Sequence, residues 1–392
     1  MSTLNDHSKI IWLLSLAAAL IFFQAYMIAP LIPKLSEVFG VPEQQIGLVV
    51  PAYMIAYGIS ILFYGMISDR VGRGKIIKIS LFAFMLLTAF TALAQSSSQL
   101  IVLRLLTGLG ASGVVPMSLA LVGDLYEPNE RGKPLGLLFA AMEGGMALGS
   151  TAGVMLEPFI GWRMLFLGMA ILAAIILWLQ GDKISRPYQK QETYKPTAGQ
   201  LLSGFYKLLS TARGLKTYCF VFWNGIFHSG IFTWLGLYFV QKYDLGAIGI
   251  GLAILGYGLP GFFFGSLIGR AADRYGRFRI IIPGLGIAAL ATALLATNIS
   301  VIMAAVAVTV ISLGYDLTQP LFAGIVTEIG GKKQGGQAMG LNVFALFTGF
   351  GVGSLVFGEI LGFGLDNALL VFAAIQFFVT IIAVPLLKNE KK

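Results

Sequence analysis

Two acidic residues lie inside long apolar stretches of the sequence and are the first candidates for chemistry. Glu143 precedes two glycines, and Asp316 lies in the segment Gly-Tyr-Asp-Leu-Thr-Gln-Pro that ends at Pro320. A charge at membrane depth costs roughly 2.5 to 3.5 kcal/mol on insertion scales, so acids retained there are functional candidates. We expect Glu143 to exchange a proton or cation and Asp316 to contact a proton or substrate. The alternatives are a structural hydrogen bond for Glu143 and satisfaction of backbone freed by Pro320 for Asp316.

Three further polar residues lie in similar apolar stretches. Arg104 lies about one turn into its stretch, where a long side chain can also extend to the membrane surface. Asn224 and His228 are one helical turn apart, but a lone histidine is more often a packing residue than a ligand. With one cysteine, Cys219, and no GxxxxGK[ST] phosphate loop, we expect no metal, no cofactor and no ATP-driven step. The energy for any transport must then come from gradients.

The stretches that carry these residues predict an all-α membrane protein. The chain has 57% hydrophobic residues, 11% charged residues and 49 glycines among 392 residues, a composition that excludes a water-soluble domain. A helix needs about 20 mostly apolar residues to cross a bilayer, and lipid forbids open sheet edges. Twelve apolar runs of that kind lie between residues 10 and 387. The first run has no small-residue cleavage site after it and is interpreted as a retained span.

The distribution of basic residues predicts the orientation of these spans. With an even number of spans, 23 of the 27 Lys and Arg residues fall on the face that holds both termini, and Lys34, Arg163 and Lys242 fall on the other. By the positive-inside rule both termini are cytoplasmic. We expect the protein to lie in the plasma or inner membrane of the cell. The net charge of +9 then reflects topology and contact with anionic membrane lipids. We therefore expect no nucleic-acid partner.

An internal repeat with an offset of 204 residues organises the whole chain. It relates Gly110 and Pro116 to Gly314 and Pro320, and Asp124 to Glu328. It also relates a loop segment to its copy, pairing Gly65, Asp69, Arg70, Gly72 and Arg73 with Gly269, Asp273, Arg274, Gly276 and Arg277. Such a parallel repeat predicts two pseudo-symmetric six-helix bundles related by an axis along the membrane normal.

The repeat also predicts the domain boundaries. We expect a first bundle over residues 1–181, a cytoplasmic linker over 182–215 and a second bundle over 216–392, acting as a monomer. The linker is the one long polar stretch, and residues 200–209 within it predict a short amphipathic helix. A linker of this kind allows the two bundles to rock against one another.

The repeated loop resembles the signature loop of the major facilitator superfamily, which lies between the second and third helices and again between the eighth and ninth. Its glycines, acids and arginines recur with the same spacing in both copies, and the resemblance covers essentially the whole chain. An arginine fork suits bidentate pairing with a carboxylate, so Arg73 can reach an acid such as Asp124. The resemblance implies that both loops, with Asp124 and Glu328, latch the cytoplasmic side in the outward-facing state. A generic basic loop is the alternative.

Other segments resemble the twelve-helix drug and metabolite efflux branch of this family. They are Pro30 to Pro33, Arg104 to Gly110, Glu130 to Gly132, and Gly161 to Arg163. The resemblance implies a coupling role for Arg104 and a cavity lined by the first, fourth, seventh and tenth helices. We expect the cavity-lining residues to be Gln24, Tyr26, Asn224, His228 and Gln319. In one departure, Ser150 occupies the step where the antiporter motif of the fifth helix usually has Gly-Pro.

Three functions are compared on these grounds. The leading prediction is a secondary active transporter that exports small amphipathic or cationic organic molecules, coupled to inward proton flow. The second is a facilitator or importer of a metabolite such as a sugar or organic acid, which the altered Gly-Pro step favours. A transporter-like receptor or membrane enzyme would need a large soluble domain or a catalytic constellation, so we expect no enzyme.

Overall fold

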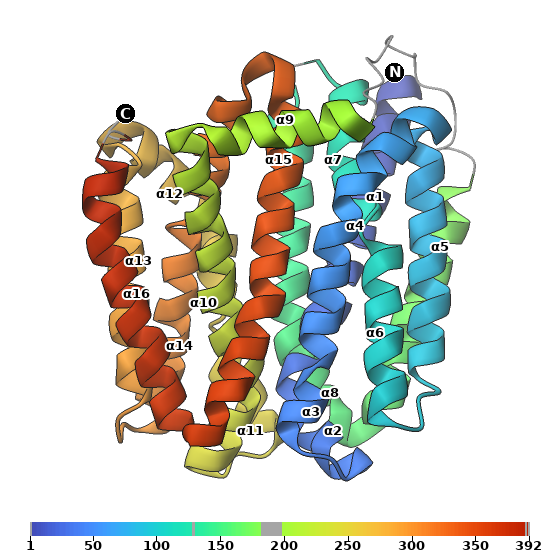
Figure 1. Cartoon of the computed structure of the whole chain (residues 1–392). Helices are drawn as coiled ribbons and strands as arrows, with labels where there is room; N and C mark the ends of the chain where they lie inside the picture. The colour runs from blue at the N-terminus through green and yellow to red at the C-terminus, as the bar shows by residue number, and fades with distance from the viewer. Residues whose placement is uncertain (1, 128–129, 182–197, 389, 391–392) are drawn as a thin grey trace.

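The computed structural model describes residues 2–127, 130–181, 198–388 and 390, and every regular element in these ranges is a helix. Figure 1 shows long helices standing side by side, with the start of the first helix and the end of the last at the same face of the bundle. We call this the terminal face and the opposite one the distal face. One helix, α9 (Ala198–Ser210), lies across the terminal face, as the amphipathic pattern predicted.

The elements follow one another in chain order within two sets. The first set contains α1 (Ser2–Tyr26), η1 (Ala29–Leu31), α2 (Ile32–Phe39), α3 (Glu43–Gly47), α4 (Val49–Val71), α5 (Arg73–Thr91), α6 (Ser97–Ala111), α7 (Val114–Leu125) and α8 (Gly132–Gln180). The second set contains α10 (Ala212–Tyr243), α11 (Ala247–Ile254), α12 (Leu259–Tyr275), α13 (Phe278–Leu295), α14 (Val301–Asp316), α15 (Gln319–Ile360), η2 (Leu361–Phe363) and α16 (Leu365–Leu387). We call these sets the first and second halves.

Two of the longest helices each contain two helical segments joined at a glycine. Gly161 interrupts α8 with φ 75°, and Gly331 interrupts α15 with φ 52°, backbone angles that favour glycine. Within the described residues, ten helical segments are long and apolar enough to cross a membrane. Counting both parts of α8 and adding α10, which is not among the ten, would give the expected number. The count of twelve spans stays a prediction.

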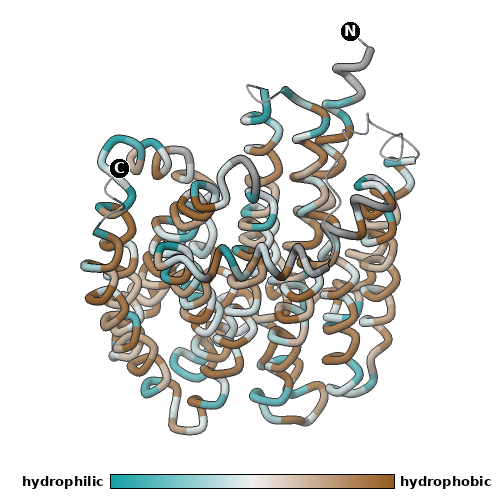
Figure 2. Tube along the Cα trace, turned by 45° about the horizontal axis from the view of Figure 1, so that its top comes forward, coloured by the Kyte–Doolittle hydropathy of each residue, from teal (hydrophilic) through white to brown (hydrophobic). Residues whose placement is uncertain are grey.

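The surface of the bundle is apolar along its length, as a membrane-spanning protein requires. Large side chains such as Trp178 and Phe159 are 80% and 72% exposed. In Figure 2 hydrophobic residues extend along the helices and hydrophilic residues gather toward their ends. The interior is apolar as well, with Trp234 only 2% exposed. A helix that is apolar on both its inner and its outer face is stable when lipid covers the outer face.

The sequence repeat is visible in how the helices pack. Gly149 of α8 lies directly on the backbone of Phe23 in α1, and its counterpart Gly353 of α15 lies on the backbone of Ile226 in α10. The absence of a side chain at each glycine lets the two backbones approach closely, which is how helices associate in lipid. Gly72 and Gly276 are the C-caps of α4 and α12 at the two signature loops, with similar φ angles of 99° and 86°.

The two halves meet on the distal side of the bundle. Gly236 of α10 lies against Pro30 of η1, with 2.7 Å between a Cβ built on the glycine and the proline carbonyl oxygen. Gly351 of α15 and Ile55 of α4 are also in contact across the two halves. Near the terminal face, by contrast, Gly136, Gly269 and Gly340 have open space within 4 Å of such a Cβ, and the close contacts of Gly204 and Gly330 there are with α15 residues rather than between the two halves. Glycine contacts between the halves are therefore found on the distal side.

The packing of α1 on α8 predicts a sharp contrast between two neighbouring glycines. A methyl group at Gly149 would collide with the Phe23 carbonyl, whereas Gly144 has no neighbour within 4 Å. We expect Gly149→Ala to destabilise the protein by about 1–3 kcal/mol, as overpacking does, and Gly144→Ala to have little effect. Thermal unfolding of both variants in detergent tests this, and equal melting temperatures would contradict the packing.

Candidate functional site

Two carboxylates, one from each half, are placed inside the bundle. Asp316 ends α14 and is 4% exposed, and Glu143 lies half-buried in α8. Among the described residues, neither Oε2 of Glu143 nor Oδ2 of Asp316 has a hydrogen-bond partner. An unpartnered buried oxygen is costly, so this pair is suited to take up a proton or a cation.

The local backbone explains where Asp316 points. The helix is interrupted between α14 and α15, and the hydroxyl of Thr318 donates to the carbonyl oxygens of Gly314 at 2.9 Å and Tyr315 at 3.0 Å. Thr318 therefore satisfies backbone groups at this interruption, a role that the sequence left open for Asp316. The Asp316 carboxylate instead lies against Gly261 in the first turn of α12.

A closed cavity of about 20 Å³ lies at the junction of the two halves. Aromatic side chains from both halves line it, among them Tyr26, Phe232, Tyr257 and Tyr315. The ring centroids of Tyr26 and Phe232 are 5.3 Å apart, and those of Phe232 and Tyr257 are 4.7 Å apart. A volume of this size holds about one water molecule. The cavity must therefore widen before it can hold an organic molecule.

The polar residues expected in the cavity divide into two groups. His228 lines it, 2% exposed, with its ring centroid 5.0 Å from that of Tyr315. Neither ring nitrogen of His228 has a hydrogen-bond partner among the described residues. Asn224 and Gln319 are not part of the lining, because the Asn224 amide donates to Gln319 at 3.1 Å and its oxygen accepts from a threonine. Tyr26 lines the cavity as expected.

Arg104 is fully buried, which rules out the alternative that its side chain extends to the membrane surface. It is 0% exposed and donates to Oε1 of Gln24 at 2.7 Å. Its guanidinium lies 4.2 Å from the ring centroid of Tyr53, a cation–π contact, and also reaches the Val49 carbonyl. Gln24 thus points at Arg104 and is absent from the described cavity lining. The placement of Gln24 and His228 on opposing walls of a wider cavity stays a prediction.

The signature loops make equivalent ion pairs in the two halves. Arg73 pairs with Asp124 and donates to the Ala120 carbonyl at 2.6 Å. Arg277 pairs with Glu328 at 2.7 Å. Both pairings were predicted, and each residue of one pair lies 204 positions from its counterpart.

The two remaining charged residues of the predicted latch in the second loop are exposed at the terminal face. Asp273 and Arg274 are exposed at the end of α12, and the Arg274 guanidinium lies 5.2 Å from the ring of Tyr275. Asp69 and Arg70, with Gly65, lie outside the part of the chain whose side chains are described. The Arg73–Asp124 pair lies within the first half and the Arg277–Glu328 pair within the second, so neither pair joins the two halves.

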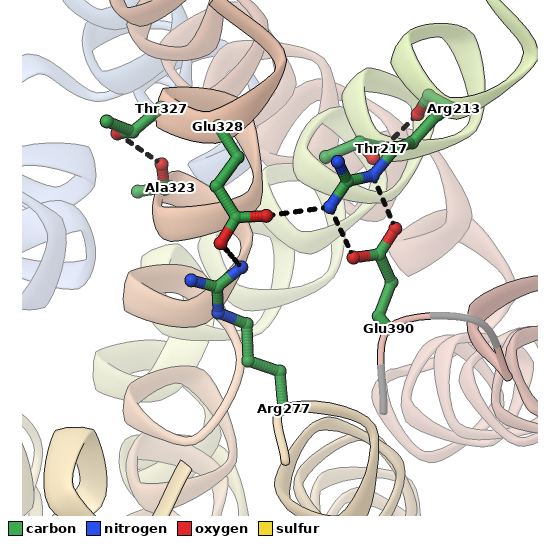
Figure 3. A network of polar contacts seen from close by, with 7 residues as sticks. All are labelled: Arg213, Thr217, Arg277, Ala323, Thr327, Glu328 and Glu390. Atoms are coloured by element: carbon green, nitrogen blue, oxygen red, sulfur yellow. Dashed lines mark hydrogen bonds and ion pairs between the residues drawn. The ribbon is translucent and has the colours of Figure 1, made fainter. Parts of the chain in front are cut away.

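A further network at the terminal face was not anticipated from the sequence. Arg213, at the start of α10, donates to both carboxylate oxygens of Glu390 at 2.7 and 2.6 Å and to Glu328 at 2.8 Å. Figure 3 shows Glu328 between Arg213 and Arg277. The hydrogen bonds that Arg213 donates to Glu390 raise the pKa of Arg213 above its ordinary value, so the guanidinium stays charged. The signal in the sequence was a single acid, Glu390, between lysines near the end of the chain.

Comparisons with known proteins agree on one family. The sequence profile described as Major Facilitator Superfamily matches residues 14–256 and 243–392. The chain is 28% identical over 351 residues to the uncharacterized MFS-type transporter YceJ of Bacillus subtilis, covering 89% of this chain and 88% of that protein. It is 28% identical over 195 residues to Multidrug resistance protein 3 of the same organism, covering 49% and 38%. Among solved structures, a D-xylose-proton symporter superimposes with a TM-score of 0.78 at 17% identity over 96% of each chain.

The buried position of Arg104 makes a testable distinction between charge and geometry. Lysine keeps the charge but cannot donate to Gln24 and the Val49 carbonyl at the same time. We expect Arg104→Lys to lose about 1–3 kcal/mol of stability because acceptors are left unpaired. Lys34→Arg, at an exposed position, is the control for the exchange itself. An unchanged melting temperature for Arg104→Lys would show that these hydrogen bonds do not stabilise the fold.

Proposed function

The chain belongs to the Major Facilitator Superfamily and is a membrane transporter; from this premise we propose that it exports small amphipathic or cationic organic molecules in exchange for protons. The observation that supports this most is the pair of carboxylates, Glu143 and Asp316, which face the junction of the halves with one unpartnered oxygen each. In the proposal Glu143 carries the proton, and Asp316 contacts the substrate.

The surroundings of the two acids favour a cationic substrate. Tyr26, Tyr257 and Tyr315 line the cavity between them, and aromatic faces attract organic cations. A cationic substrate neutralises a buried carboxylate as a proton does. Binding of the cation therefore favours loss of the proton, and binding of the proton favours release of the cation. Two curated relatives, Multidrug resistance protein 3 and the Puromycin resistance protein pur8 of Streptomyces alboniger, are named for resistance. These names agree with export but belong to those proteins.

The same proposal assigns a state to the structure. With the terminal face in the cytoplasm, as the basic residues predict, contact between the halves on the distal side corresponds to an inward-facing arrangement. The bundles 1–181 and 216–392 would rock about the linker 182–215 in a monomer, and the loop pairs Arg73–Asp124 and Arg277–Glu328 would belong to the cytoplasmic latch.

One observation supports the second candidate, a facilitator or importer of a metabolite. Ser150 replaces the proline that the antiporter motif usually has, and its hydroxyl donates to the Ala147 carbonyl at 3.0 Å within an unbroken turn of α8. Proline at that step would remove a backbone hydrogen bond and bend the helix. Some relatives are named as metabolite transporters, such as the Gallate transporter of Pseudomonas putida. Proteoliposomes tested with gallate and with tetraphenylphosphonium separate the two candidates.

The proposed proton site predicts a specific transport defect. Glu143→Gln keeps the volume and hydrogen bonding of the side chain but removes the titratable proton. We expect the variant to exchange tetraphenylphosphonium across proteoliposomes by counterflow but to lose accumulation driven by an imposed pH gradient, by roughly tenfold or more. The measurement compares counterflow with gradient-driven uptake in the same preparation.

Asp316→Asn is the matched control for this experiment. A residue that contacts only the substrate should raise the half-saturating concentration of tetraphenylphosphonium while leaving accumulation coupled to protons. Gradient-driven uptake by Glu143→Gln at the wild-type rate and pH dependence would move the proton site elsewhere. No response of wild type to the pH gradient would leave a facilitator.

The latch predicts a shift between conformations. Asp124→Asn weakens the pair with Arg73, and Glu328→Gln weakens the equivalent pair with Arg277. Each pair is formed within its own half in this inward-facing arrangement, so it acts on the latch only by holding its loop in position; if it does so, each variant should populate the inward-facing state more and transport more slowly. Accessibility of single cysteines placed near the terminal face to a water-soluble maleimide measures this. Identical accessibility in the variants and wild type would reject the latch.

A further inference from the structure

Helix α11 and helix α12 lie in one predicted span, the eighth, but the helix is interrupted between them. Residues 255–258 form turns, and Gly258 has φ 90° and ψ −20°, a left-handed conformation. The backbone N–H of Gly258 donates to Oγ of Ser312 in α14 at 2.8 Å. A backbone donor that leaves its own helix for a neighbouring side chain fixes the position of the interruption.

The residues around the interruption fit closely against α14. Pro260 has no N–H, so it cannot donate to the carbonyl four residues earlier, at Gly256. The backbone of Gly256 lies directly on the side chain of Thr309, leaving no room for a Cβ. In the first turn of α12, Gly261 lies against the Asp316 carboxylate. A sharp break with an identifiable cause is a designed feature of a helix.

The interruption is not inherited from the internal repeat. At an offset of 204 residues, Gly258 and Pro260 correspond to Met54 and Ala56, which lie within the continuous helix α4. Ser312 corresponds to Gly108, which has no side chain to accept a hydrogen bond. The second half therefore has its break where α4 is continuous, and the equivalent span of the first half is divided earlier, at Leu48 between α3 and α4.

The two parts of the interrupted span differ in their neighbours: α11 packs mainly on α8 of the first half and also on α14 and α10 of its own half, whereas α12 packs mainly on its own half. Helix α11 packs on α8 of the first half, where Gly251 contacts Met155. Helix α12 packs on α14 and α13 of its own half, and it meets α8 near the break, where Gly258 lies beside Ala147. Separation of the halves at the distal face must therefore act on α11 differently from α12.

We infer that the interruption at Gly258 is a hinge, and that α11 is a distal gate that turns relative to α12 when the halves separate. Ser312 is a positioning residue that holds the hinge by accepting from Gly258. Asp316 anchors the first turn of α12 to α14. The inference concerns the movement of one segment and holds whichever ion or substrate is transported.

Distances within the second half distinguish a hinge from rigid rocking. In a Cys219→Ser background, spin labels are placed at Leu252 in α11, Leu267 in α12 and Leu290 in α13, which are 57%, 50% and 65% exposed. A Gly236→Trp wedge opens the distal face, because that glycine contacts the backbone of Pro30. Electron–electron double resonance in nanodiscs then compares the wedge variant with its parent.

The hinge predicts that the wedge shifts the 252–290 distance by several ångström while the 267–290 distance stays unchanged. Adding Gly258→Ala with Pro260→Ala, which favours a continuous helix, should abolish that shift. Gly265→Ala, at an open position within α12, is the control for helix propensity and should leave the shift intact. If the wedge changed neither the 252–290 nor the 267–290 distance, the hinge would be overturned. It would also be overturned if both distances changed by the same amount.

A second measurement avoids the wedge. Hydrogen exchange at residues 255–259 should be at least tenfold faster in Ser312→Ala, because the Gly258 amide loses its acceptor. Ser354→Ala is the matched control, since Ser354 is also buried and its hydroxyl has no hydrogen-bond partner among the described residues. Equal exchange in both variants would overturn the assignment of Ser312 to the hinge.

Discussion

Two buried carboxylates, one in each apolar bundle and each with one oxygen that has no partner among the described residues, are the constraint around which the rest of the structure is arranged. Each buried charge costs several kcal/mol unless a proton, a cation or a hydrogen-bond donor compensates it. Glu143 and Asp316 come from different halves, so the cost depends on how the halves sit and on what lies between them. A proton or cation bound at this junction therefore shifts the equilibrium between arrangements of the halves by the difference in its affinity for them.

The remaining interactions keep that junction defined. Glycine contacts such as Gly149 on Phe23 hold the helices of each half together without polar groups. The distal contacts, among them Gly236 on Pro30, close the bundle on one side. At the terminal face the ionic network around Glu328 ties several elements of the second half together. Two halves joined on one closed side allow a small change at the centre to act on both faces.

Much of the fold could be predicted from the sequence because it depends on repetition and spacing. The offset of 204 residues predicted the pairs Arg73–Asp124 and Arg277–Glu328, which the structure contains. The apolar stretches predicted an all-helical bundle. Contacts that depend on depth and packing could not be predicted: Arg104 was placed near an end of its span and is instead fully buried against Gln24. Sequence distance from a span end does not give the tilt or the interruptions of the surrounding helices.

The break at Gly258 and the contact of Arg213 with Glu390 illustrate the same limit. Pro260 and the glycines at 256, 258 and 261 are visible in the eighth span, but the acceptor, Ser312, is 54 residues from Gly258. Arg213 and Glu390 are 177 residues apart, and no periodicity connects them. Both contacts are absent from the first half, so the repeat that predicted so much gives no indication of them.

The most direct test of the central claim is the release of protons on substrate binding. Purified protein in weakly buffered detergent solution is mixed with tetraphenylphosphonium while a pH indicator dye is followed. If Glu143 exchanges its proton for the cation, wild type should release protons in proportion to the ligand bound, and Glu143→Gln should bind with little or no release. Equal release from both proteins, or binding to wild type with no release, would contradict the account.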